Sequence, residues 1–159
     1  MVRRIVPTSV DERETTLRAL EATPTTLPAL LRNVTEAQVR IQGQAPDSWA
    51  IVEVVSHLID GEHRTFERTR RMVDETNPFL PVYPDDDYSK LPLGELIEKF
   101  RVLRAAHTEF LRGLSESDWA HPGRHELYGD VSIGFLVRST VSHDAEHLAQ
   151  ISRKLVSGG

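Results

Sequence analysis

Hydrophobic residues recur every three or four positions in four long stretches of this chain, which is the spacing at which side chains share one face of an α-helix. These stretches cover about residues 11–33, 49–75, 93–114 and 132–156. No stretch carries the alternating pattern that is typical of a half-buried strand. The pattern therefore predicts an all-α four-helix bundle of one domain over residues 1–159.

Residues with strong conformational preferences refine the ends of these helices. Pro24 and Pro28 lie inside the first stretch, and proline lacks an amide donor, so we expect a kink or a short restart there. Asp47 or Ser48 is placed to cap the second helix, and Ser132 to cap the fourth.

Two segments between the helices are predicted to be irregular. The first, residues 77–92, holds four prolines and the consecutive aspartates Asp85, Asp86 and Asp87. The second surrounds residues 123–129. Long loops without secondary structure often border functional sites, so we expect the first of them near one.

The absence of cysteine narrows the chemistry that is available to the chain. Disulfides, thiolate metal sites, iron–sulfur clusters and a cysteine nucleophile are all excluded. Any metal ion must therefore be held by histidine, aspartate or glutamate.

Composition and charge bear on partners and location. A hydrophobic fraction of 39% and a charged fraction of 27% are typical of a folded globular protein, and the net charge of −5 disfavours nucleic-acid binding. Arg64, Arg68, Arg70 and Arg71 cluster, but acidic residues alternate with them, which predicts a solvated helix face. No apolar run approaches the roughly 18 residues of a membrane span, and no signal peptide is visible, so we expect a cytoplasmic protein without membrane contact.

His143 and His147 lie four residues apart in the last predicted helix. At this spacing two imidazoles project from one helix face and can reach the same metal ion. Asp144 stands where HExxH metalloproteases have their glutamate, which disfavours a protease. Taken alone, the pair fits a core-packing or surface role as well as a metal site.

His57 in the second predicted helix offers a third nitrogen ligand. Gly61 follows it one turn later and has no side chain, which leaves room for a ligand. Three histidines from two helices would form one face of a coordination sphere and leave positions open for water or substrate.

Two segments together resemble the DinB family of damage-inducible and YfiT-like bacterial proteins. They are WAIVEVVSHL at residues 49–58 and HDAEHLAQI at residues 143–151, and the resemblance extends over nearly the whole chain. It implies a four-helix bundle, often a homodimer, in which three motif histidines bind one divalent ion such as zinc or nickel. Those positions here are His57, His143 and His147.

The resemblance also bears on activity, because some members of the family are thiol-dependent enzymes such as maleylpyruvate isomerases and bacillithiol S-transferases. A bound metal ion lowers the pKa of a coordinated thiol or water. The first expectation is a thiol-dependent S-transferase or isomerase that uses a low-molecular-weight thiol on a small-molecule substrate. The alternatives are a hydrolase with a metal-activated water and a non-catalytic metal-binding bundle for stress response or dimerisation.

Five further residues are candidates around this centre. Glu53 and Asp144 are predicted to orient a ligand imidazole or to act as a base. Gln150, His107 and Asp60 are predicted to support the ligands or to bind substrate. His107 is expected to be a hydrogen-bonded buried histidine and not a fourth ligand.

Buried carboxylates need partners, and two are expected. Glu62 and Asp144 face the apolar sides of their helices, so each should bond a histidine nitrogen or an arginine such as Arg138. His121 and His125 are expected at the solvated surface, with a substrate-binding role left open.

Overall fold

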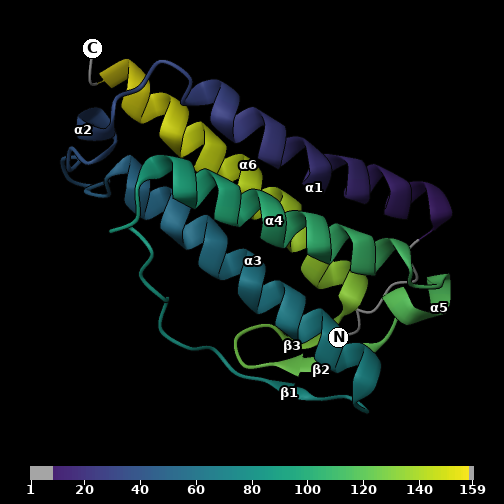
Figure 1. Cartoon of the computed structure of the whole chain (residues 1–159). Coiled ribbons are helices and arrows are strands. Elements are labelled where there is room, and N and C mark those ends of the chain that lie inside the picture. The colour runs from purple at the N-terminus through teal and green to yellow at the C-terminus, as the bar shows by residue number, and fades with distance from the viewer. Residues whose placement is uncertain (1–8, 158–159) are drawn as a thin grey trace.

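Four long helices pack side by side in the computed structural model, which describes residues 9–157 (Figure 1). The first and third helices in chain order each pack against both the fourth and the sixth, so they occupy opposite corners of the bundle. The predicted four-helix bundle is confirmed. The long helices are α1 (Val10–Leu30), α3 (Ile51–Asp74), α4 (Leu93–Arg112) and α6 (Ile133–Ser157), and two short helices are α2 (Glu36–Val39) and α5 (Glu116–Trp119).

Helix α1 runs without interruption through Pro24 and Pro28, so the predicted restart is wrong. Pro24 has no amide to donate to the Leu20 carbonyl one turn earlier. The Nη1 atom of Arg104, on α4, donates to that carbonyl at 2.9 Å instead. A side chain from a neighbouring helix thus satisfies the acceptor that the proline leaves free.

A small three-stranded sheet covers one end of the bundle, which corrects the expectation of a purely helical chain (Figure 1). Strand β1 (Phe79–Leu80) pairs in parallel with β2 (Pro122–His125), and β2 pairs antiparallel with β3 (Gly129–Ser132). A Cβ atom at Gly123 would lie 2.9 Å from Leu80 and 3.1 Å from Met72, so glycine permits this packing. Strands of two to four residues are too short to show an alternating pattern.

His125 is buried at the end of β2, so its predicted place at the solvated surface is wrong. Its Nδ1 atom accepts hydrogen bonds from the amides of Leu127 and Tyr128, and its ring stacks on Tyr128. Burial and the nearby Arg68 lower the pKa of His125, which keeps the ring neutral and able to accept.

The hydrophobic core forms two clusters along the bundle axis. Every long helix has buried polar residues at the level between them. They include Thr23 on α1, Glu62 and Thr69 on α3, Arg104, His107 and Thr108 on α4, and Thr140 and Asp144 on α6.

Arg104 is the centre of this polar layer, with a side chain only 1% exposed. Its guanidinium contacts both oxygens of Asp144, at 2.7 and 3.1 Å, and Glu62 at 2.8 Å. Glu62 also contacts Nδ1 of His107 at 2.7 Å, and Thr23 donates to Asp144. Both buried carboxylates are therefore paired as expected, although the arginine is Arg104 and not the predicted Arg138.

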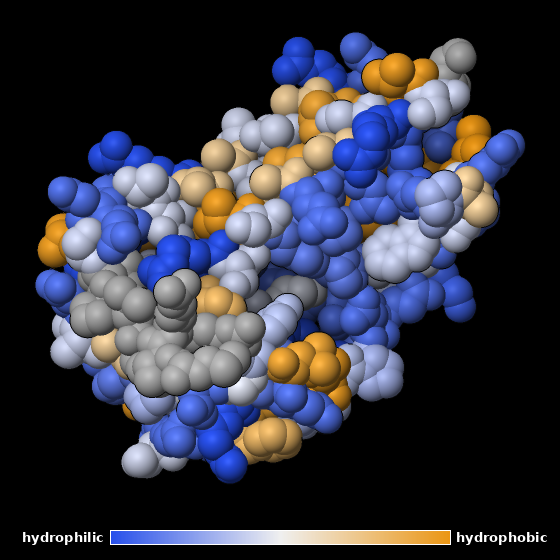
Figure 2. Space-filling view, turned by 180° about the vertical axis from the view of Figure 1, so that it is seen from behind, coloured by the Kyte–Doolittle hydropathy of each residue, from blue (hydrophilic) through white to orange (hydrophobic). Residues whose placement is uncertain are grey.

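The surface seen from behind is mostly hydrophilic, with hydrophobic residues scattered over it (Figure 2). Among the described helices, none is both long enough and apolar enough to cross a bilayer.

Replacing Arg104 with methionine should destabilise the bundle by about 3–5 kcal/mol, because two buried carboxylates would lose their cation. Urea unfolding followed by circular dichroism measures this change. The exposed Arg101, on the same helix and 54% exposed, provides the control Arg101→Met, which should cost little. Equal effects of the two substitutions would contradict a stabilising role for the layer.

Glu62 should make stability depend on pH in the acidic range. Burial by itself raises the pKa of Glu62, but Arg104 and His107 outweigh it and lower the pKa from 4.5 to about 2. Because the folded pKa lies below the unfolded one, this stabilisation is full above pH 4.5 and is lost as the pH falls towards 2. The free energy of unfolding of Glu62→Gln should consequently vary less over that range than that of the unchanged protein.

Candidate metal centre

Three histidines from two helices converge at one place in the bundle. His57 lies on α3, and His143 and His147 lie one turn apart on α6. The Nε2 atom of His143 is 2.8 Å from that of His57 and 3.1 Å from that of His147. All three side chains are partly buried, and their ligand atoms lie within 4.8 Å of one another. The structure therefore brings together the three residues that the sequence singled out.

Asp85 fixes the orientation of His57. Its carboxylate lies 2.6 Å from Nδ1 of His57. A carboxylate only accepts hydrogen bonds, so the proton belongs on Nδ1 and the lone pair of Nε2 faces the other histidines. Sequence reasoning missed Asp85 as a site residue, although the run of aspartates in a long loop was a signal.

Gln150 orients His147 in the same way. Its Oε1 atom lies 2.7 Å from Nδ1 of His147, and its amide nitrogen donates to Asp47 at 3.0 Å. Lys154 holds Asp47 through a contact of 2.9 Å. This chain of contacts settles which end of the Gln150 amide faces the histidine, and it leaves Nε2 of His147 free to bind an ion.

His143 lies between the other two histidines and packs against α3. A Cβ atom at Gly61 would lie only 3.2 Å from Cε1 of His143. The space beside Gly61, which was expected to leave room for a bound ligand, is therefore filled by the imidazole ring of His143. Burial and then the neighbouring His147 and His57 lower the pKa of His143 to about 4. The ring is therefore neutral at neutral pH, as metal coordination requires.

Trp49 forms a wall beside the centre, and sequence reasoning did not single it out as a site residue. Its ring meets that of His57 edge-on at 5.2 Å and lies parallel to that of His147 at 6.4 Å. The tryptophan stands at the start of the motif segment, which was the available signal.

The two predicted catalytic carboxylates are engaged in other contacts. Glu53 accepts from the amide of Ala50 at 2.7 Å and from Gln42 at 3.0 Å. Glu53 thereby accepts from a backbone amide that would otherwise lack a partner at the start of α3. The N-cap residue there is Ala50 and not the expected Asp47 or Ser48. Both oxygens of Asp144 contact Arg104 in the buried polar layer. Catalytic roles for Glu53 and Asp144 stay predictions.

His107 and Asp60 occupy different surroundings. His107 is fully buried, and its Nε2 atom lies 3.2 Å from the Thr69 hydroxyl, so it belongs to the polar layer of the core. Asp60 is buried on α3 next to the loop that carries Asp85 and accepts from the amide of Asp86 at 3.1 Å. A supporting or substrate-binding role for Asp60 stays a prediction.

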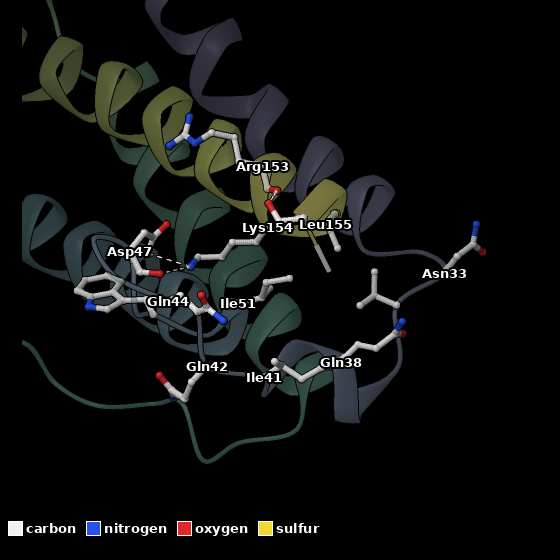
Figure 3. A pocket seen from close by; sticks show the side chains of 14 residues that line it. Asn33, Gln38, Ile41, Gln42, Gln44, Asp47, Ile51, Arg153, Lys154 and Leu155 are labelled. Carbon is white, nitrogen blue, oxygen red and sulfur yellow. Dashed lines mark hydrogen bonds and ion pairs between the residues drawn. The ribbon is translucent and has the colours of Figure 1, made fainter. Parts of the chain in front are cut away.

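A groove of about 810 Å³ lies beside the centre, between α2, the 41–49 segment and the end of α6 (Figure 3). Trp49 and Asp47 line it and also take part in the contacts around the histidines. Amide side chains and hydrophobic residues make up much of the remaining wall: Asn33, Gln38, Gln42, Gln44, Val34, Ile41, Ile51 and Leu155.

Comparison with protein families agrees with this geometry. A model of the DinB superfamily matches residues 19–151. The chain belongs to the DinB superfamily. This superfamily match includes all three converging histidines.

Relatives in the DinB superfamily carry names that refer to metals. A protein of Oceanobacillus iheyensis named "Putative metal-dependent hydrolase OB0782" is 25% identical over 137 residues, which are 79% of this chain and 78% of the relative. A Bacillus cereus protein named "Putative metal-dependent hydrolase" is 21% identical over 155 residues, which are 92% of this chain and 87% of the relative.

Solved structures share the fold. YfiT from Bacillus subtilis, described as "a probable metal-dependent hydrolase with an unusual four-helix bundle topology", has a TM-score of 0.83 at 20% identity, covering 92% of this chain and 87% of YfiT. The four-helix bundle protein TT2238 has a TM-score of 0.69 at 22% identity, covering 89% of this chain and 98% of TT2238.

Removing one histidine of the cluster should abolish stoichiometric metal binding, because two imidazoles on one helix do not complete the set of three ligands. We expect His57→Ala to lose binding and His107→Ala, in the buried layer, to retain it. Calorimetric titration with zinc and with nickel of protein purified without a metal-affinity tag measures both. A similar loss from the two variants would contradict the ligand assignment.

Proposed function

We propose that this member of the DinB superfamily is a hydrolase that depends on one divalent metal ion held by His57, His143 and His147. The observation that carries the proposal is the convergence of three Nε2 atoms, combined with acceptors at Nδ1 of His57 and His147. The names of the relatives support hydrolysis as the reaction.

The donor set fits zinc or nickel, since neutral imidazoles suit both ions and the chain has no thiolate. Three protein ligands are typical of catalytic zinc sites, which keep a coordination position open, whereas structural sites are closed by four. A divalent ion in such a site supplies a Lewis acid and lowers the pKa of water towards neutrality.

The residues of this chain contribute orientation and shielding. Asp85 and Gln150 keep the proton on the outer nitrogens of two histidines, which holds their inner nitrogens ready for coordination. Trp49 covers one side of both rings, and this limits the access of bulk water from that side.

We place the substrate in the groove next to Trp49. Its amide side chains offer donors and acceptors in pairs, and its hydrophobic wall offers apolar contact. These features suit a small molecule that has both hydrogen-bonding groups and an apolar part. The groove shares Trp49 and Asp47 with the surroundings of the histidines, so a substrate bound in it would have to extend past Trp49 to bring its scissile bond to the metal ion.

The thiol-dependent S-transferase or isomerase that the sequence favoured first has less support, because the relatives are named as hydrolases. A non-catalytic bundle that uses metal for stability is the other alternative. The hydrophobic clusters on both sides of the polar layer already supply a core, and this argues against a purely structural ion.

The proposed hydrolase should cleave activated esters or amides only when metal is present. We expect chelation with EDTA to abolish turnover of nitrophenyl esters and N-acyl amino acids, and added zinc or nickel to restore it. His147→Ala should lose turnover beyond recovery by metal, at nearly unchanged melting temperature. Turnover that needs an added thiol and an electrophile would instead favour the transferase, and metal binding without turnover of either kind would favour the non-catalytic bundle.

A further inference from the structure

Five side chains on one face of α3 hold the backbone of the segment that follows the helix. Moving along the helix, Ser56 accepts from the amide of Tyr88, and Asp60 accepts from the amide of Asp86. The remaining three are arginines that donate to carbonyls: Arg64 to Pro84, Arg68 to Pro81 and Arg71 to Phe79, at 2.9 to 3.1 Å.

These contacts form a regular series. The helix positions are spaced by four, four, four and three residues, so they lie along one stripe. Their partners run in the opposite direction along the chain, so residues 79–88 lie antiparallel to the helix. Three of the four arginines that the sequence assigned to a solvated face therefore bind the loop backbone, whereas Arg70 is exposed as expected. We call this series the α3 ladder.

The middle of the α3 ladder brackets Asp85. Arg64 holds the carbonyl of Pro84 on one side, and Asp60 holds the amide of Asp86 on the other. Arg64 also contacts Asp60 at 3.2 Å, so the two supports are joined to each other. The Asp85 side chain is 52% exposed, and the Asp60 side chain is 4% exposed. Asp85 therefore gets its position from its buried neighbours more than from its own packing.

We propose that the Asp60–Arg64 pair is a positioning device for the metal centre, which sets metal affinity by holding Asp85 against Nδ1 of His57. This inference rests on the proposed metal centre. Asp60 and Arg64 lie three and seven residues after His57, on the same side of α3. One rigid helix therefore carries both the metal ligand His57 and the two residues that hold Asp85 in place. Loss of an outer partner of a metal ligand typically costs about 10- to 100-fold in affinity.

The direction in which metal affinity changes when Arg64 is replaced separates a positioning role from a simple electrostatic one. Removing the positive charge of Arg64 reduces repulsion of a cation, which by itself strengthens metal binding. If Arg64 acts by positioning Asp85, its removal weakens binding. Arg64→Gln therefore gives opposite results under the two mechanisms.

The test is a titration of the metal-free full chain with Co²⁺, followed by visible absorption, which reports both the dissociation constant and the ligand geometry. We expect Asp85→Asn and Arg64→Gln each to raise the dissociation constant about tenfold or more. In the double variant, Arg64→Gln should add little to Asp85→Asn, because it acts through Asp85. The control is Arg71→Gln at the far end of the ladder, which should bind Co²⁺ as the unchanged protein does.

Tighter or unchanged binding by Arg64→Gln, additive effects in the double variant, or equal weakening by Arg71→Gln would each overturn the proposal. If Arg64→Gln does not fold, as judged by its circular dichroism, Asp60→Asn takes its place. Loss of the Asp60 charge weakens metal binding by electrostatics as well, so the deciding result is then whether its effect disappears in the Asp85→Asn background. A wrong assignment of the metal centre would give a different result. The unchanged protein would then bind no Co²⁺, or the His57→Ala variant would bind it as well as the unchanged protein does.

Discussion

The arrangement of the bundle depends on the buried guanidinium of Arg104, which contacts all three of the other long helices. From α4 it reaches the Leu20 carbonyl on α1, Glu62 on α3 and Asp144 on α6. A buried charge is tolerated only when it is paired and hydrogen-bonded, so this set of contacts strongly restricts how the helices rotate and slide against one another.

That restriction reaches the metal centre through the sequence neighbours of the two carboxylates. Asp144 follows His143 directly, so fixing its side chain towards Arg104 also fixes which way α6 presents its two histidines. Glu62 lies five residues after His57 and fixes α3 in the same manner. The face that carries the three histidines and the buried polar layer are therefore two consequences of one helix arrangement.

Much of the fold and of the candidate site could be predicted from the sequence. For each part that was missed there is a physical reason. The four helices follow from hydrophobic spacing, and the cluster of His57, His143 and His147 from spacing and motif. The restart considered at Pro24 and Pro28 did not occur, and a distant arginine satisfies the carbonyl that Pro24 leaves free. The strands were missed because the pattern within each one is too short to see, and because β1 is held by pairing with the distant β2.

Local sequence by itself determined the four long helices and the kinds of residue available as metal ligands, since helical periodicity and the absence of cysteine depend only on the order and chemistry of residues. Tertiary structure alone decided which distant residues complete the centre. Asp85 reaches His57 from a loop 28 residues away, and Asp47 reaches Gln150 across 103 residues. No periodicity encodes such pairs, because Asp47 and Asp85 lie in segments outside the helices, where hydrophobic spacing carries no information about contacts. These pairs exist only in the packed tertiary structure.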